Sequence, residues 1–143
     1  MRFHALAFAI ALAAPAIAQT RTCTSTLAGL GCGATLTVTF TPIGKAGNQD
    51  LLLQASGLHP DAFGIMVFGV APAAIPLPSG CTLWTDFVWG HTVKADGFGD
   101  FSWSRAWPAS AHAQYYIQFG TFVIDGSGNL EVRATDCRFA ECH

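Results

Sequence analysis

The stretch Ala34-Thr-Leu-Thr-Val-Thr-Phe-Thr41 decides the fold class of this chain. Apolar side chains and threonines alternate along it, so Leu36, Val38 and Phe40 share one face and the threonines occupy the other. Alternation with a period of two, in a run rich in β-branched residues, is typical of a half-buried β-strand. The stretch therefore predicts a strand with one face in a hydrophobic core.

Outward from this strand, short apolar runs recur between turn sequences rich in glycine and proline. Two of these turns, Ala95-Asp-Gly-Phe-Gly99 and Asp125-Gly-Ser-Gly-Asn129, predict β-hairpins between their flanking strands. After residue 18, no window of the sequence repeats its apolar residues with the 3.6-residue period of a helix. About seven or eight short strands at this spacing predict an all-β fold, an antiparallel β-sandwich of the immunoglobulin-like or Greek-key type.

The N-terminal residues predict a cleaved signal peptide. Met1-Arg2 is positively charged, Phe3 to Ile17 is almost wholly apolar, and Ala16-Ile17-Ala18 places small residues before a cut ahead of Gln19. The apolar run of ~15 residues is shorter than the ~20 residues that span a bilayer, so we expect no transmembrane segment. The predicted location is secreted: extracellular, periplasmic or at the cell surface.

The domain organisation follows from these patterns. We expect a signal peptide at 1–18, an irregular cysteine-containing segment at 19–33, a β-sandwich at 34–136 and a cysteine-containing tail at 137–143.

The chain is weakly and slightly negatively charged. Charged residues make up 11% of it, against about 25% in an average soluble protein. Seven basic and nine acidic residues give a net charge of −2, which becomes −3 when Arg2 leaves with the signal peptide (six minus nine). Without a basic run, the sequence predicts that nucleic acid is not a partner.

Five cysteines remain after cleavage: Cys23, Cys32, Cys81, Cys137 and Cys142. In an exported protein, they predict two disulfides and one spare thiol, which could link two chains covalently. The short spacing favours a Cys137–Cys142 bridge, with Cys23 or Cys32 tied to Cys81. A zinc or copper site at Cys137, Cys142 and His143 is the less favoured alternative, because disulfides form readily in an oxidising compartment.

Several landmarks occur in a recognisable order: Ser56-Gly-Leu-His-Pro60, Ile75-Pro-Leu-Pro78, Ser79-Gly-Cys-Thr-Leu83, Asp96-Gly-Phe-Gly99 and Tyr116-Ile-Gln118. Over residues 30–136 this order resembles small exported β-sandwich domains that are common in predicted secreted proteins of planctomycetes and related bacteria. The resemblance implies the same fold. That family has no established activity, so it transfers no functional residue to this chain.

Phe101, Trp103, Arg105 and Trp107 occupy alternate positions and must share one face of their strand. An exposed row of this kind could stack on sugar rings, with Arg105 as a polar anchor. In the alternative interpretation, Phe101 and Trp103 belong to the core and Arg105 lies at the rim against a tryptophan face, as burial preferences favour. Trp103, Arg105 and Trp107 are the candidate ligand-binding residues.

The sequence lacks the common catalytic signatures: the Gly-x-Ser-x-Gly elbow, the His-Glu-x-x-His zinc motif and the glycine-rich phosphate loops. A triad around a serine would have to combine residues scattered through the sequence, namely His59, His91 or His112 with Asp61, Asp86 or Asp100. The Asp125–Asn129 turn resembles the start of a calcium loop, and Asp136 provides an acid at the twelfth position, but Leu130 occupies the sixth position, which such loops give to glycine. The glycines and Asn129 also suit a hairpin turn, which needs no metal and is the favoured interpretation. We therefore expect no catalytic residue, no metal and no cofactor.

These observations predict a non-catalytic exported β-sandwich protein, an extracellular or cell-surface module for adhesion, matrix formation or ligand binding. Its partner would be an extracellular polysaccharide or a matrix or cell-surface protein. Two alternatives remain open: a carbohydrate-binding module that uses surface aromatics, and a small secreted hydrolase with a dispersed site.

Overall fold

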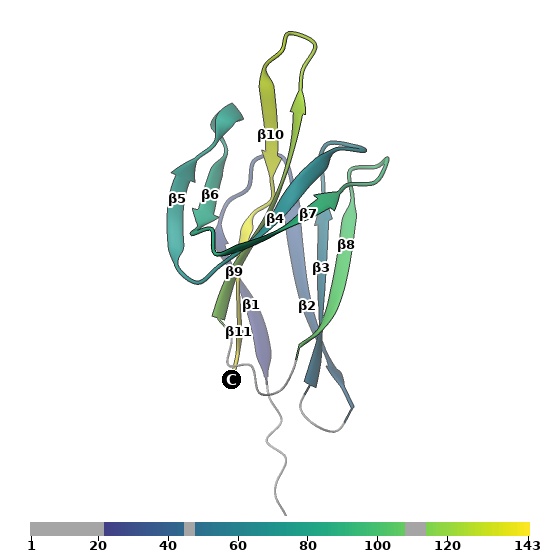
Figure 1. Cartoon of the computed structure of the whole chain (residues 1–143). Helices are drawn as coiled ribbons and strands as arrows, with labels where there is room; N and C mark the ends of the chain where they lie inside the picture. Colours follow the sequence, from purple (N-terminus) through teal and green to yellow (C-terminus); the bar gives the residue numbers. More distant parts are fainter. Residues whose placement is uncertain (1–21, 45–47, 108–113) are drawn as a thin grey trace, which may run out of the picture.

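The computed structural model describes residues 22–44, 48–107 and 114–143. Apart from a single 3₁₀ turn, the regular structure in these ranges is β-strand, as predicted, although it is divided into eleven strands rather than seven or eight. The elements, labelled in Figure 1, are β1 (Cys23–Gly29), β2 (Thr35–Ile43), β3 (Asn48–Ser56), β4 (Phe63–Gly69), β5 (Pro72–Pro76), η1 (Pro78–Gly80), β6 (Thr82–Thr85), β7 (Trp89–Lys94), β8 (Phe101–Trp107), β9 (Gln114–Ile124), β10 (Leu130–Ala134) and β11 (Cys137–Cys142).

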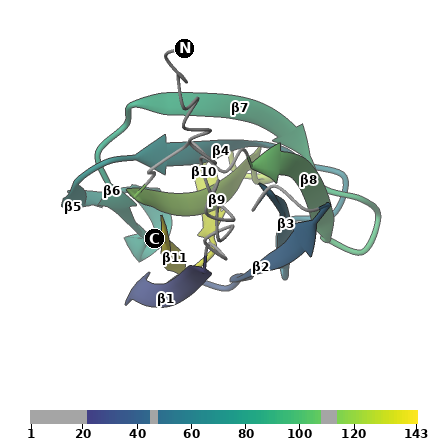
Figure 2. The same cartoon turned by 90° about the horizontal axis from the view of Figure 1, so that it is seen from below.

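Two antiparallel sheets form the sandwich. The larger has the order β1-β11-β9-β4-β7, with β10 paired to the far end of β9, and the smaller has the order β2-β3-β8. Seen from below in Figure 2, β2, β3 and β8 form a layer beside the larger sheet, and the two-stranded β5–β6 ribbon lies on the other side of that sheet. The core fills the space between the two main layers.

The opening alternation is confirmed in β2. Leu36 is fully buried, Val38 and Phe40 are half-buried, and the threonines between them are exposed. The inward-facing residues of both sheets meet in one cluster, which includes Leu51, Leu53, Met66, Phe68, Ile117 and Phe119. Each fully buried side chain of this size contributes roughly 1.5–3 kcal/mol to the free energy of unfolding.

Residues 23–29, predicted as part of an irregular segment, and residues 137–142, predicted as a tail, are instead strands of the sandwich. Strands β1 and β11 pair with each other from Cys23 opposite Cys142 to Gly29 opposite Cys137, and β11 also pairs with β9. The threonine- and serine-rich sequence of β1 suits an exposed edge strand, where little apolar pattern is needed. The signal peptide predicted at 1–18 lies outside the described residues.

The predicted Cys137–Cys142 disulfide is also wrong. Both cysteines lie in β11, and five residues of extended chain span roughly 16 Å, whereas the Cα atoms of a disulfide are about 4–7 Å apart. The bridges are Cys23–Cys142 and Cys32–Cys81, and the second of these is one of the two predicted ties to Cys81. Two intramolecular disulfides are consistent with an oxidising compartment.

The spare thiol belongs to Cys137, whose side chain is fully buried. Burial raises the pKa of this thiol to about 11, so little of it is the reactive thiolate at neutral pH. A covalent dimer through the spare cysteine does not fit this position, because a second chain cannot reach it in the folded protein.

The turn at Ala95–Gly99 does not form the predicted hairpin. Strand β7 pairs with β4 in the larger sheet, and β8 pairs with β3 in the smaller one. The turn is therefore an arch that carries the chain from one layer to the other. The second predicted hairpin is confirmed, since Asp125–Asn129 joins the paired strands β9 and β10.

Among the described residues, no helix is long and apolar enough to cross a bilayer.

Candidate functional site

The arch positions the candidate site by sending β7 and β8 into different sheets. Close to the arch the layers are in contact, and Val93 and Ala95 are buried. At the other ends of the two strands, near Trp89 and Trp107, a hollow of about 700 Å³ opens between the sheets. Five aromatic rings and one arginine dominate its walls: Phe68, Trp89, Trp103, Trp107, Tyr115 and Arg105. We call this the aromatic hollow.

The rings of the aromatic hollow hold one another in place. The Phe68 ring is central: its centroid lies 4.7 Å from that of Trp89, 6.2 Å from that of Trp103 and 6.3 Å from that of Tyr115. Trp107 meets Tyr115 edge to face at 5.5 Å. Such tilted and edge-to-face pairs are favourable ring geometries. Because the rings contact one another directly, the aromatic walls are fixed before any ligand arrives.

The row predicted on β8 runs from the core into this hollow. Phe101 packs on Phe119, with their ring centroids 5.1 Å apart. Trp103 and Trp107 are half-buried and pack against the edge of the core, while Arg105 between them is exposed. The structure thus brings together the three residues that the sequence selected. The row is intermediate between the two interpretations, since the tryptophans support the core and also line an open cavity.

The other three rings are Phe68, Trp89 and Tyr115. From the sequence, Trp89 raises the same question of core or binding residue, but nothing places it with the β8 row, and Phe68 and Tyr115 were missed. The three rings lie on β4, β7 and β9, which all belong to the sheet facing β8. Alternation within one strand identifies the residues that share its face, but it does not identify the strand that will face it. The available signal was weak: each of three β-rich runs, which are not consecutive in the sequence, contains an aromatic residue.

The aromatic hollow has one charged residue. All nine Asp and Glu residues of the chain lie in the described ranges, and none of them lines it. Among the described residues, Arg105 takes part in no ion pair. The cation–π contact in the described part of the chain joins Lys94 to Phe63, outside the hollow. The predicted stacking of Arg105 on a tryptophan face is therefore not seen, and Arg105 is an exposed residue in the wall of the hollow.

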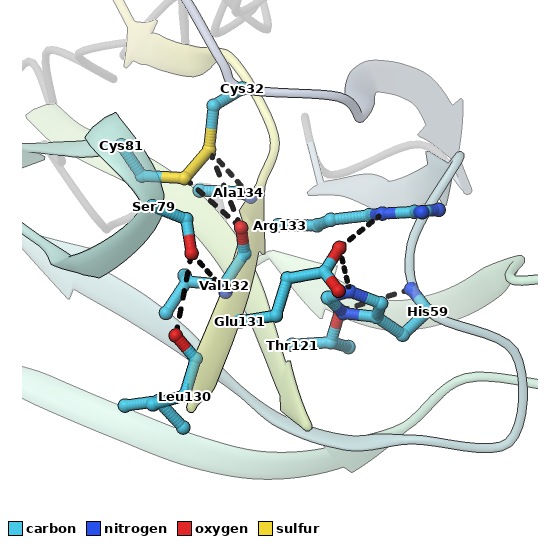
Figure 3. Close-up of polar contacts among 10 residues, drawn as sticks. All are labelled: Cys32, His59, Ser79, Cys81, Thr121, Leu130, Glu131, Val132, Arg133 and Ala134. Atoms are coloured by element: carbon cyan, nitrogen blue, oxygen red, sulfur yellow. Dashed lines mark hydrogen bonds and ion pairs between the residues drawn. A yellow bond between two sulfur atoms is a disulfide. The ribbon is translucent and has the colours of Figure 1, made fainter. Parts of the chain in front are cut away.

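A separate, polar cluster lies around His59, away from the aromatic hollow (Figure 3). The hydroxyl of Thr121 lies 3.2 Å from Nδ1 of His59 and accepts the backbone N–H of the same residue at 3.1 Å. Nε2 of His59 lies 3.0 Å from a carboxylate oxygen of Glu131, an ion-pair distance without the alignment of a hydrogen bond. The same oxygen lies 3.7 Å from Nε of Arg133.

The Thr121–His59–Glu131 order resembles a hydrolytic triad but lacks an accessible nucleophile. The Thr121 side chain is completely buried, and the imidazole of His59 is nearly so. No substrate can reach the hydroxyl without unfolding the strand. The contacts instead fix the 57–62 loop to β9 and β10.

Of the dispersed histidine–aspartate pairs considered from the sequence, those of His59 and His91 do not assemble in the described part of the chain. Among the described residues, Asp61 pairs with Lys94 at 3.9 Å, and the Asp86 carboxylate accepts the backbone N–H groups of Val70 and Ala71. His91 lies against the ring of Trp89, and His112 is outside the described residues.

Ser79 is likewise a structural residue. Its hydroxyl accepts the N–H of Val132 at 3.1 Å and donates to the carbonyl of Leu130 at 3.4 Å (Figure 3). These bonds cover the outer edge of β10 beside the Cys32–Cys81 disulfide. A serine engaged on both sides by backbone groups protects a strand edge rather than attacking a substrate.

The calcium-like turn satisfies its own carboxylate. Oδ1 of Asp125 accepts the N–H groups of Ser127 and Asn129 at 2.8 Å each, and Oδ2 accepts the Asn129 amide at 3.2 Å. These hydrogen bonds, with that of Asn129 strongest, hold the pKa of Asp125 below its ordinary value. Within the described ranges, no three His, Cys, Asp or Glu side chains are grouped to hold a metal ion.

Comparison of the chain with protein-family models, with characterised proteins and with solved structures finds no significant match.

Proposed function

We propose that this protein is a non-catalytic, exported binding domain, and that the aromatic hollow binds a sugar unit of an extracellular polysaccharide. One observation carries the proposal: Trp103, Arg105 and Trp107 line a single cavity together with three further rings from the facing sheet. Ligand cavities typically have volumes of about 300–1,000 Å³, apolar walls and a few polar groups. The aromatic hollow has each of these properties.

The chemistry of the walls suits a saccharide. Pyranose rings present flat faces of C–H groups, which pack on aromatic rings, and hydroxyl oxygens around their edges. Tryptophan and tyrosine offer large apolar faces with a polar atom at one end. The tilted arrangement around Phe68 offers faces at several angles, as a chair-shaped ring with two faces and a rim requires.

Export is supported by the apolar N-terminal stretch and by the two disulfides, which suit an oxidising compartment. A binding rather than a hydrolytic role is supported by the burial of Thr121, the hydroxyl that contacts an imidazole in the His59 cluster. The aromatic hollow holds rings in place, but no carboxylate among the described residues lines it to act as a general acid or base. Such a site favours binding of a sugar over its hydrolysis.

Titration with polysaccharides, followed by tryptophan fluorescence, tests the proposal. Three of the four tryptophans line the aromatic hollow, and the fourth, Trp84, is held elsewhere through a hydrogen bond from its Nε1 to the carbonyl of Leu30. A bound sugar should shift the emission of the wild type to the blue. Trp103→Ala should weaken binding by at least tenfold, and the matched control Trp84→Phe should keep the wild-type affinity.

Failure of every tested glycan to change the emission would count against sugar binding. Equal affinities of the wild type and Trp103→Ala would place the sugar outside the aromatic hollow. Release of a reducing end during the titration would overturn the non-catalytic part of the proposal.

A further inference from the structure

We infer that the aromatic hollow selects a saccharide that carries an anionic group, a carboxylate or a sulfate ester, and that Arg105 binds this group. The inference rests on the proposed function and specifies its substrate class. It follows from the position of Arg105, the distribution of the acids and the environment of Trp107.

Arg105 is unusual because it occupies an inward-facing position. It lies opposite the fully buried Leu51 in the β3–β8 ladder and between Trp103 and Trp107 on the same face of β8. Inward-facing positions in a sandwich normally hold apolar side chains. At this one the chain places a guanidinium that has no ion-pair partner among the described residues. Its charge is thus available to a ligand in the cavity.

The acids are distributed so that they do not compete for Arg105. Three of them, Asp61, Asp96 and Asp100, line a separate polar cleft at the arch, where β8 begins. Lys94 lines the same cleft, so three carboxylates outnumber one cation at the start of β8. Near the end of β8, Asp50 lies opposite Ala106 on the outer face of the sheet, and Arg105 is the charged residue on the inner face. An anionic sugar is repelled from the arch and attracted to the aromatic hollow, where the apolar walls weaken dielectric screening.

Trp107 adds an apolar ring to the same cavity wall. Its Nε1 is enclosed, so the ring rather than this N–H faces a ligand in the aromatic hollow. Arg105 and Trp107 are two residues apart on one face, so a single acidic sugar ring can contact both.

Arginine, rather than lysine, suits this task. The guanidinium is planar and can donate two parallel hydrogen bonds to a carboxylate or to a sulfate. The planar face of a guanidinium can also lie over a flat ring of the ligand or of the cavity wall. The expected ligand unit is consequently a uronic acid or a sulfated sugar in an otherwise neutral or acidic chain.

The test compares oligogalacturonate with its methyl ester, because esterification removes the charge and keeps the sugar backbone. A sulfated galacto-oligosaccharide distinguishes the two possible anions. In low salt, we expect the wild type to bind at least one acid about tenfold more tightly than the ester, with a preference that declines as salt is added.

Three variants assign the preference to Arg105. Arg105→Gln should weaken binding of the acid about tenfold and binding of the ester much less, so that the preference for the acid is lost. Arg105→Lys should retain part of the preference, because the charge remains but the paired donors are lost. Arg133→Gln is the matched control, since it removes the same charge from a surface position beside Glu131 and should leave both affinities unchanged.

The outcomes separate the two proposals. If ester and acids bind equally and Arg105→Gln changes neither affinity, the anionic preference is overturned while sugar binding stands. If neither the acids nor neutral sugars bind, the proposed function itself fails. If Arg105→Gln keeps its affinities but aggregates, Arg105 is a guard against pairing at the β8 edge, and the inference is overturned.

Discussion

Two turns of this protein have almost the same sequence and the same hydrogen bonds, and yet they do opposite things. Asp96-Gly-Phe-Gly-Asp100 and Asp125-Gly-Ser-Gly-Asn129 each begin with an aspartate whose N–H donates to the carbonyl of the fifth residue at 2.9 Å. In both, Oδ1 of that aspartate accepts the N–H groups of the third and fifth residues. The fourth residue is a glycine in the left-handed region, with φ of 81° and 85°.

The strands on either side behave differently. After the second turn β10 returns along β9 and pairs with it, whereas after the first turn β8 leaves β7 and joins the other sheet. The first turn is held from outside: the N–H of Leu58 donates to the carbonyl of Gly99, and the N–H of Asp61 donates to the carbonyl of Asp96. The second turn is exposed along its whole length.

The comparison shows that a turn sequence specifies a reversal of the chain but not the partner of the next strand. The 57–62 segment packs at the first turn, and the apolar faces of β7 and β8 then separate to enclose the core. In this protein the difference creates the aromatic hollow, which lies between the separated strands.

Replacement of the turn glycine should give the largest difference between the two turns. A Cβ at Gly99 would lie 2.3 Å from the carbonyl oxygen of Leu58, whereas one at Gly128 would meet nothing within 4 Å. Both substitutions place an L-residue in the left-handed region at a cost of about 1–2 kcal/mol, and Gly99→Ala must also displace backbone at about 2 kcal/mol more. Urea denaturation should therefore give a loss of about 3–4 kcal/mol for Gly99→Ala and about 1–2 kcal/mol for Gly128→Ala.

Equal losses for the two alanine variants would show that Leu58 does not confine the arch. A Gly99→Ala protein that is destabilised but keeps its sugar affinity would show that the arch can shift without closing the aromatic hollow.

The sequence predicted this fold where the information is local. The alternation of Leu36, Val38 and Phe40 with threonines identifies β2, and the spacing of Trp103, Arg105 and Trp107 places them on one face. Both predictions need only the geometry of a single strand.

The failed predictions depend on distant partners. The pairing of β1 with β11 brings Cys23 to Cys142 across 119 residues, and nothing near either cysteine indicates it. The arch depends on Leu58, about 40 residues before Gly99, and the hollow depends on Phe68, Trp89 and Tyr115 in the facing sheet. A prediction based on sequence spacing alone favours the partner nearest in the sequence. It therefore paired Cys137 with Cys142 and missed the distant partner, Cys23.

The residue that holds the arch should matter more than its counterpart beside the hairpin. Leu58 is 1% exposed and Leu130, just after the second turn, is 46% exposed. Leu58→Ala removes a buried side chain and should cost about 2–3 kcal/mol, whereas Leu130→Ala should cost less than about 1 kcal/mol. Thermal unfolding of the two variants under one condition measures the difference, and similar losses would place Leu58 outside the essential core.

Acid should destabilise both turns by the same mechanism, and the effect should be smaller than that of Leu58→Ala. The pKa of Asp96 is held below its ordinary value mainly by the N–H of Asp100 and then that of Phe98, just as Asn129 and Ser127 lower the pKa of Asp125. A carboxylate with a lowered folded-state pKa stabilises the protein above its unfolded value, about 3.8, and this contribution is lost as the pH falls through the folded value.

The variants Asp96→Asn and Asp125→Asn keep an acceptor oxygen but cannot titrate. Each should therefore reduce the fall in melting temperature between pH 5 and pH 2.5 relative to the wild type. Asp50→Asn, which removes a carboxylate from β3, is the matched control. Unchanged acid sensitivity in both turn variants would mean that these hydrogen bonds do not carry the pH dependence.

Replacement of the arch sequence by the hairpin sequence should have the smallest effect. The variant Phe98→Ser/Asp100→Asn writes the hairpin sequence into the arch, and the Phe98 side chain that it removes is 88% exposed. Because the shared hydrogen bonds use Asp96, Gly99 and backbone groups, stability should change by no more than about 0.5 kcal/mol. Strand β8 should still pair with β3, since Leu58 and the apolar face of β8 are unchanged. Amide hydrogen exchange of Trp103 and its neighbours, together with the sugar affinity, measures whether β8 still pairs with β3. Wild-type protection would show that packing between the layers sends β8 to the other sheet. Pairing of β7 with β8 would show that residues 98 and 100 decide it.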